Sequence, residues 1–104
     1  MDLPEFTTSG PGPAAKTRRR ILIVDDDPAV LEALNTALAP TFDIITAQSG
    51  GEALEALGRH LLDLVLLDNV LPDMPGLAIL GIVKRYLPSL PVVLVTGHGS
   101  EEIS

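Results

Sequence analysis

Short apolar segments recur along the chain, and each has the length of a β-strand. Three of them are uninterrupted runs of Ile, Leu and Val, at residues 21–24, 64–67 and 92–95. Such runs are typical of strands that are buried on both faces of a sheet. The fourth segment, residues 42–47, mixes polar with apolar positions and therefore predicts a strand at the edge of the sheet.

Segments with the period of an amphipathic α-helix lie between these strands. The first opens with Asp27 and Pro28, which suit the N-cap and the first helical position. The second opens with a capping box at residues 49–52, and the third follows Pro75 and Gly76. The expected apolar faces are Val30, Leu31, Leu34 and Leu38 in the first helix, Ala53, Leu54, Leu57 and Leu61 in the second, and Leu77, Leu80, Val83 and Leu87 in the third.

The predicted strands and helices alternate, with strand starts spaced by about 20 to 28 residues. Alternation at this spacing indicates βαβ units, whose crossovers are right-handed. The pattern therefore predicts an α/β fold with a doubly wound parallel sheet.

Composition narrows the possible chemistry. The 104 residues include no Cys and only three aromatic side chains, which excludes a disulfide scaffold, a cysteine-based zinc site and an aromatic platform for single-stranded nucleic acid. No apolar run is long enough to span a membrane, and no secretory leader pattern opens the chain. We therefore expect a cytoplasmic domain without membrane association.

The net charge of −7 is unevenly distributed. Residues 1–20 carry a balance of +2 and residues 21–104 a balance of −9. The first 19 residues are rich in Pro and Gly without apolar periodicity, so we expect a flexible tail there. The acidic remainder disfavours binding to nucleic-acid backbones and favours cations.

Residues that could bind a ligand or take part in a reaction follow three of the predicted strands. The acidic run 25–27 follows the first strand, Asp68 ends the third, and Thr96 and Gly97 follow the fourth. Because ligands of open parallel sheets bind outside the carboxyl ends of the strands, we expect these residues to converge there.

Converging carboxylates repel one another unless a cation lies among them, and an all-oxygen ligand set suits Mg²⁺. A carboxylate beside such a metal can act as a nucleophile and form an aspartyl phosphate. Thr96 would then donate a hydrogen bond to a phosphoryl oxygen, and Gly97 would leave its backbone N–H accessible. Simpler interpretations stay open, with Asp27 as a helix cap only and Asp68 as an ordinary strand terminator.

Three sequence segments together resemble the receiver domain of two-component response regulators. They are ILIVDDDP at residues 21–28, DLVLLDNVLPDMPG at 63–76 and PVVLVTGHG at 91–99, and the resemblance extends over residues 20–104. It implies a flavodoxin-like sheet with strand order 2-1-3-4, in which the fifth strand of the family is missing.

The resemblance also implies a role for each acidic residue. Asp68 would accept a phosphoryl group from a phosphohistidine on a sensor histidine kinase or a phosphotransfer protein. Asp26 and Asp68 would bind Mg²⁺ directly, Asp25 would act mainly through water, and Val70 would supply its backbone carbonyl. The domain would not be a stand-alone enzyme, although it would catalyse its own phosphorylation and dephosphorylation.

Residues near the ends of these segments have implied roles as well. Thr96 would be the switch hydroxyl that moves toward the phosphoryl group, which Gly97 would also contact. Val70 and His98 occupy positions that tune how long the phosphoryl group survives.

The sequence departs from the family at its end. The family's fifth strand carries a Lys that pairs with the phosphoryl group, whereas this sequence ends at Ser104 without such a strand. We therefore expect residues 20–104 to form a receiver domain that is incomplete at its C-terminal end, poorly stable, and open to self-association through the edge of the fourth strand.

Two alternative functions remain open. The first is an interaction module derived from a receiver domain, without phosphotransfer. The second is a small phosphatase with an aspartate nucleophile, because Asp25 and Asp27 satisfy an Asp-x-Asp pattern after a strand.

Overall fold

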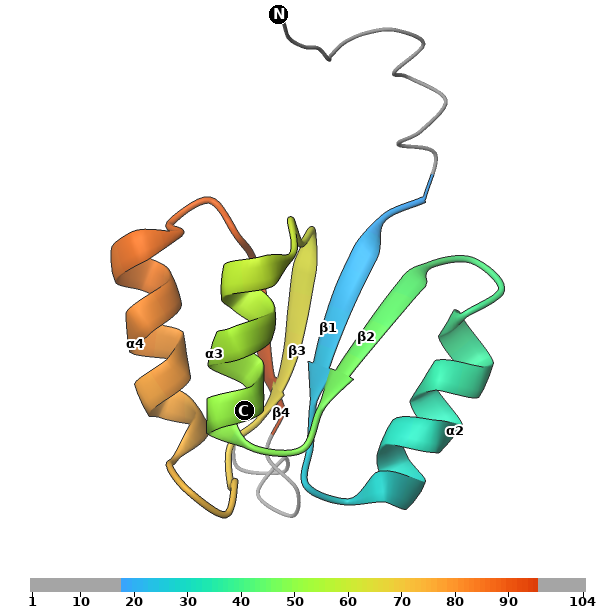
Figure 1. Cartoon of the computed structure of the whole chain (residues 1–104), viewed down its shortest axis with the longest axis horizontal. Helices are drawn as coiled ribbons and strands as arrows, with labels where there is room; N and C mark the ends of the chain where they lie inside the picture. Colours follow the sequence, from blue (N-terminus) through green and yellow to red (C-terminus); the bar gives the residue numbers. More distant parts are fainter. Residues whose placement is uncertain (1–17, 96–104) are drawn as a thin grey trace, which may run out of the picture.

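The computed structural model describes residues 18–95, which form parallel strands alternating with helices (Figure 1). The elements are β1 (Arg20–Val24), α2 (Pro28–Leu38), β2 (Asp43–Ala47), α3 (Gly50–Arg59), β3 (Leu64–Asp68), α4 (Gly76–Tyr86) and β4 (Val92–Val95). The strand order is β2-β1-β3-β4, which confirms the predicted doubly wound sheet with β2 at an edge. No helix within residues 18–95 is long and apolar enough to cross a membrane.

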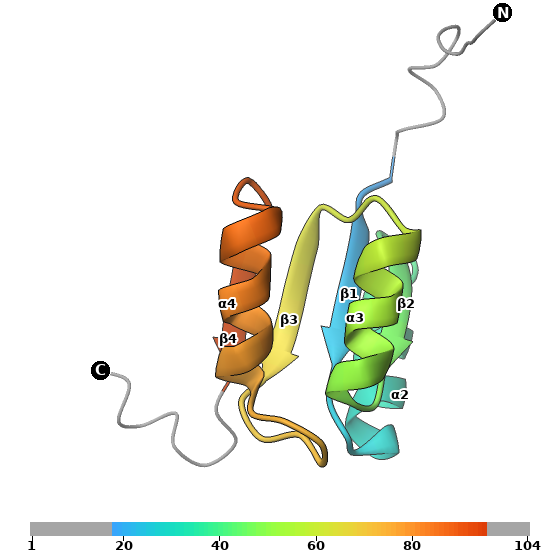
Figure 2. The ribbon, with the colours of Figure 1, turned by 60° about the vertical axis from the view of Figure 1, so that its left-hand side comes forward.

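Helices cover both faces of the sheet, as the two views show (Figures 1 and 2). Because side chains alternate along a strand, β1 contributes to two apolar clusters. Leu22 and Val24 pack in the larger cluster with buried residues of α3 and α4, and Ile21 and Ile23 pack against Leu31 of α2. The strand is thus buried on both faces, as its sequence predicts.

The predicted starts of α2 and α3 are confirmed by their caps, whereas α4 starts at Gly76 after Pro75 without a side-chain cap. The Asp27 carboxylate accepts a hydrogen bond from the N–H of Ala29 at 2.9 Å, and Pro28 occupies the first helical position. The Ser49 hydroxyl accepts a hydrogen bond from the N–H of Glu52 at 3.1 Å. These bonds satisfy donors that the first helical turn leaves without partners.

All three helices differ from their predicted apolar faces, and in α2 Val30 is 36% exposed. Helix α3 ends at Arg59, so Leu61 lies beyond it and is 85% exposed. Helix α4 buries Ile79 and Val83, whereas Leu77 is 57% exposed. Gly76 packs closely against β3, so the side of α4 that carries Gly76 faces the sheet. Ile79 and Val83, three and seven positions further along, lie on the same side.

The prediction that β4 is buried on both faces is wrong for the described part of the chain. Val93 and Val95 are 48% and 49% exposed, whereas Val92 and Leu94 pack against the larger cluster. Val93 pairs with Leu66, which belongs to the face that α2 covers. Within residues 18–95, α2 is the helix on this face, and it lies over β1 and β2 rather than β4.

Ordered contacts begin before the predicted end of the tail. The Arg18 guanidinium donates a hydrogen bond to the Asp43 carboxylate at 3.1 Å, and it also donates to the carbonyls of Phe42 and Ala39. The carbonyl of Arg19 accepts the N–H of Asp43 at 2.9 Å. Arg18 and Arg19 therefore belong structurally with β1 and β2.

Candidate functional site

A cluster of three carboxylates lies at the carboxyl ends of β1 and β3. Asp25 and Asp26 follow β1 directly, and Asp68 is the last residue of β3. These strands are neighbours in a register that pairs Val24 with Leu67, so the residues that follow each partner meet at the sheet edge. One carboxylate oxygen of each Asp lies within 4.8 Å of the others.

The backbone around the first strand gives the three consecutive acidic residues different surroundings. The N–H of Asp25 donates to the carbonyl of Ala47 at 3.0 Å, and its carboxylate accepts the N–H of Asp27 at 2.9 Å. Asp27 in turn caps α2, which confirms the simpler interpretation of that residue. Asp26 is the exposed member of the carboxylate cluster, while Asp25 and Asp68 are half-buried.

The electrostatics of the cluster favour a cation. Burial raises the pKa of Asp25, and the charges of Asp68, Asp26 and Asp27 raise it further, although the hydrogen bond from the Asp27 N–H opposes these effects. Two like charges 4 Å apart repel by about 4 kcal/mol at an effective dielectric constant near 20. The donor set consists of carboxylates alone, so its chemistry fits Mg²⁺ rather than zinc or a softer metal.

The loop between β3 and α4 folds back beside Asp68. The N–H of Val70 faces the Asp68 carboxylate at 3.4 Å, a long contact, and Val70 forms an isolated bridge with Pro75. Val70 is 68% exposed, whereas Leu71 is buried in the larger apolar cluster. The structure thus brings the backbone of Val70 to the cluster and directs its side chain to solvent.

Three predicted site residues, Thr96, Gly97 and His98, lie outside the described residues. The residue before them, Val95, is the register partner of Asp68. Its carbonyl accepts the N–H of Asn69 at 3.0 Å. The described part of β4 therefore ends beside the carboxylate cluster.

Two residues that support this edge were not singled out by the sequence patterns. Asp73 accepts hydrogen bonds from the first two N–H groups of α3, those of Gly50 and Gly51. Gly76 lies so close to Asp68 that no side chain fits between their backbones. The pair of glycines opening α3 was the available signal, because glycine at a helix start often permits close approach of another segment.

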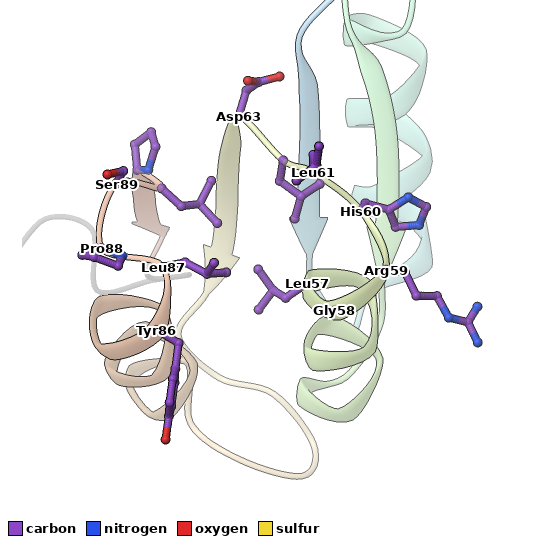
Figure 3. Close-up of a pocket in the computed structure, with 13 residues that line it drawn as sticks. Leu57, Gly58, Arg59, His60, Leu61, Asp63, Tyr86, Leu87, Pro88 and Ser89 are labelled. Carbon is purple, nitrogen blue, oxygen red and sulfur yellow. The ribbon is translucent and has the colours of Figure 1, made fainter. Parts of the chain in front are cut away.

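A cavity of about 570 Å³ lies at the opposite end of the strands from the carboxylate cluster, between the C-terminal ends of α3 and α4 (Figure 3). Leu57, Leu61 and Leu87 contribute apolar walls, and His60 and Asp63 lie along its border. The carboxylate cluster lies at the carboxyl ends of the strands, so this cavity and the cluster are at different ends of the molecule.

Comparison with curated proteins identifies relatives among transcriptional regulators. The transcriptional regulatory protein GlrR of Escherichia coli is 37% identical over 81 residues, which make up 77% of this chain and 18% of that protein. The probable transcriptional regulatory protein TcrX of Mycobacterium tuberculosis is 40% identical over 83 residues, or 79% of this chain and 36% of that protein. The chain thus matches about a fifth to a third of these relatives.

Solved structures share the fold. A CheY-like response regulator receiver domain protein from Methanospirillum hungatei has a TM-score of 0.76 and 35% identity, covering 82% of this chain and 69% of that one. The response regulator TrrA of Thermotoga maritima, solved in complex with Mg²⁺-BeF, has a TM-score of 0.75 and 32% identity, covering 83% and 76%.

The family model described as the response regulator receiver domain matches residues 21–104, which include every strand of the sheet except Arg20 at the start of β1. The fold, the strand order and the position of the carboxylate cluster agree with this match. The chain belongs to the response regulator receiver domain family.

Proposed function

We propose that this receiver domain accepts a phosphoryl group on Asp68 in a reaction that requires Mg²⁺. The observation that carries the proposal is the convergence of Asp25, Asp26 and Asp68, whose oxygens lie within 4.8 Å of one another although they come from two strands. Asp68 is the member that stands on the neighbouring strand, apart from the acidic run. A related receiver, TrrA, was solved in complex with Mg²⁺-BeF, which supports the proposal of a Mg²⁺ site here.

In the proposed reaction, an oxygen of the Asp68 carboxylate attacks the phosphorus of a phosphohistidine on the donor protein. The P–N bond breaks, and the histidine nitrogen keeps the electron pair and takes up a proton. Asp26 and Asp68 would hold Mg²⁺ directly, Asp25 would hold it through water, and the backbone carbonyl of Val70 would complete the protein ligands. When bound, Mg²⁺ would neutralise charge on the phosphoryl oxygens.

Residues beyond β4 complete the proposed site. Thr96 would donate its hydroxyl to a phosphoryl oxygen, and Gly97 would contact the same group. Val70 and His98 would limit the access of water and so set the lifetime of the aspartyl phosphate. The exposed side chain of Val70, next to the Asp68 carboxylate, is consistent with that role.

The proposed partners are those expected of the receiver family. We propose that a sensor histidine kinase or a phosphotransfer protein supplies the phosphoryl group in the cytoplasm, and that residues 20–104 form the receiver domain of a regulator. The chain spans about a fifth of the E. coli relative GlrR, a transcriptional regulator. Control of an output such as transcription is therefore part of the proposal.

One observation favours a second role in self-association. Val93 and Val95 expose about half of their surfaces on β4, which is the edge strand among the described residues. An exposed apolar edge strand readily pairs with another chain. We propose that two copies associate through this edge, as an interaction module would.

The test is phosphorylation of the full-length protein by acetyl phosphate, followed by intact mass. We expect wild type to gain the mass of one phosphoryl group with Mg²⁺ and not with EDTA. Asp68→Asn should gain none, whereas Glu32→Gln, which removes an exposed carboxylate of α2, should behave like wild type. Equal phosphorylation of Asp68→Asn would overturn the proposal.

A Mg²⁺ titration separates the receiver from a module without phosphotransfer. Saturable binding by wild type and its loss in Asp26→Asn are expected from the receiver proposal. No saturable binding at millimolar Mg²⁺ would favour the interaction module instead. Turnover of a phosphate ester that depends on Asp25 and not on Asp68 would identify a phosphatase.

A further inference from the structure

The loop between β3 and α4 is anchored on a helix that contributes no carboxylate to the cluster. Both oxygens of Asp73 accept hydrogen bonds from α3, from the N–H of Gly50 at 2.8 Å and from the N–H of Gly51 at 2.9 Å. These N–H groups have no partners within the helix, and the amino end of a helix attracts negative charge. Asp73 therefore binds the tip of the loop to the start of α3.

An apolar contact beside Asp73 strengthens the same attachment. A Cβ atom on Gly50 would lie 2.4 Å from Cγ and 2.6 Å from Sδ of Met74. Met74 thus packs directly on the helix backbone, and it also contacts the larger apolar cluster. Figure 2 shows the loop reaching from beneath α4 toward the amino end of α3.

The base of the same loop adjoins Asp68. The N–H of Gly76 donates to the carbonyl of Asn69 at 2.8 Å, and the bridge between Val70 and Pro75 closes the loop. Val70, whose N–H faces the Asp68 carboxylate, is part of this base, and Asp73 holds the tip of the loop. The position of the Val70 backbone at the cluster therefore depends on attachments at both ends of the loop.

We propose that Asp73 is a positioning residue for the Mg²⁺ site, which it affects by holding the Val70 backbone beside Asp68 without touching the metal. The inference rests on the proposed function, because Val70 and Asp68 are ligands only in that proposal. Coupling between two sites is reciprocal. Mg²⁺ binding should in turn stabilise the hydrogen bonds that Gly50 and Gly51 donate to Asp73.

The affinity test compares Mg²⁺ titrations of the full-length wild type with those of three variants. Asp73→Ala removes the anchor, Ser49→Ala removes the hydroxyl that accepts the Glu52 N–H in the same helix turn, and Glu52→Gln removes a negative charge from that turn. We expect Asp73→Ala to weaken Mg²⁺ binding about tenfold or more, as loss of outer ligand support does. The two controls should stay within about twofold of wild type.

A second readout needs no variant. Amide hydrogen exchange at Gly50 and Gly51 of wild type should slow when Mg²⁺ saturates the protein, because the coupling acts in both directions. This measurement keeps the inference testable if Asp73→Ala does not fold, and Asp73→Asn, which retains one acceptor oxygen, should show an intermediate affinity.

Each outcome decides between the two proposals. Unchanged Mg²⁺ affinity in Asp73→Ala, or an equal loss in Ser49→Ala or Glu52→Gln, would overturn the positioning role while leaving the proposed function intact. Unchanged exchange at Gly50 and Gly51 would also contradict the coupling. Absence of saturable Mg²⁺ binding by wild type would overturn both proposals together.

Discussion

A Cβ atom on Gly76 would lie 2.3 Å from the backbone carbonyl oxygen of Asp68. Helix α4 therefore starts in direct backbone contact with the residue that we propose as the phosphoryl acceptor. The same Cβ would lie 3.0 Å from Cα of Asn69, so no small movement of a side chain relieves the clash. The geometry at the end of β3 thus requires glycine at position 76.

Replacing Gly76 by Ala is expected to destabilise the fold by roughly 1–3 kcal/mol, because the start of α4 must move away from β3. A matched control lies in the same helix, since a Cβ on Gly81 meets nothing within 4 Å. Gly81→Ala should stabilise the domain by about 0.5–1 kcal/mol through its higher helix propensity. Urea unfolding measures both changes, and a neutral Gly76→Ala would contradict the close contact.

Removing one charge from the carboxylate cluster should stabilise the metal-free protein. In Asp68→Asn the pKa of Asp25 should fall toward its ordinary value, because the Asp68 charge is one cause of its elevation. We expect a gain on the order of 1 kcal/mol in the free energy of unfolding at neutral pH. Glu32→Gln changes the net charge equally away from the cluster and should give no such gain. Thermal unfolding in EDTA compares the two.

The attachment of Asp73 to α3 should make stability depend on pH in the acid range. The N–H groups of Gly50 and Gly51 hold the pKa of Asp73 below its ordinary value of 3.8. The charged carboxylate therefore stabilises the fold above pH 3.8, and this contribution is lost as the pH falls through the lowered pKa of the folded state. The difference in stability between wild type and Asp73→Asn should be constant at neutral pH and shrink below pH 3.8. An equal difference at every pH would contradict the ionic character of the anchor.

Asp25 affects the pH dependence of the free energy of unfolding in the opposite direction from Asp73. Its pKa is raised above 3.8, so its charged form is less favourable in the folded protein than in the unfolded chain. The metal-free fold should therefore lose stability as the pH rises from 3.8 through the raised pKa of Asp25. Asp25→Asn should remove this decline, whereas Asp73→Asn should not. Unfolding curves across the acid range with EDTA present distinguish the two residues.

The edge of β4 predicts concentration-dependent association. Val93→Lys places a charge among exposed apolar groups and should shift the protein toward monomer in sedimentation velocity. Leu61→Lys is the control. Leu61 is even more exposed, but it follows α3 and lines the cavity instead of lying on β4. If the two variants associate equally, the edge of β4 is not the interface.

Much of the fold and the carboxylate cluster could be predicted because both depend on local patterns and one topological rule. The apolar runs predict the strands, and alternation with helices predicts a parallel sheet. Once strand order 2-1-3-4 holds, Asp25 and Asp68 must meet, since they follow paired residues of β1 and β3.

The remaining features arise from contacts between distant segments. Asp73 lies 22 residues from Gly51, and the glycines that open α3 permit the close approach of another segment without indicating which residue it supplies. The buried side of α4 depends on how closely Gly76 approaches β3. The helical spacing of Leu77 and Leu80 does not reveal this approach. The half-exposed face of β4 depends on where α2 lies in space.

We propose above that Asp68 is the residue that carries the phosphoryl group. The most direct test is to phosphorylate the full-length protein with acetyl phosphate and Mg²⁺, reduce the acyl phosphate with borohydride, and locate the modified residue by peptide mass spectrometry. Reduction converts a phosphorylated aspartate to homoserine. We expect homoserine at position 68 and not at 25 or 26. Homoserine at Asp25 or Asp26, or unmodified Asp68 in a protein that has gained a phosphoryl group, would contradict it.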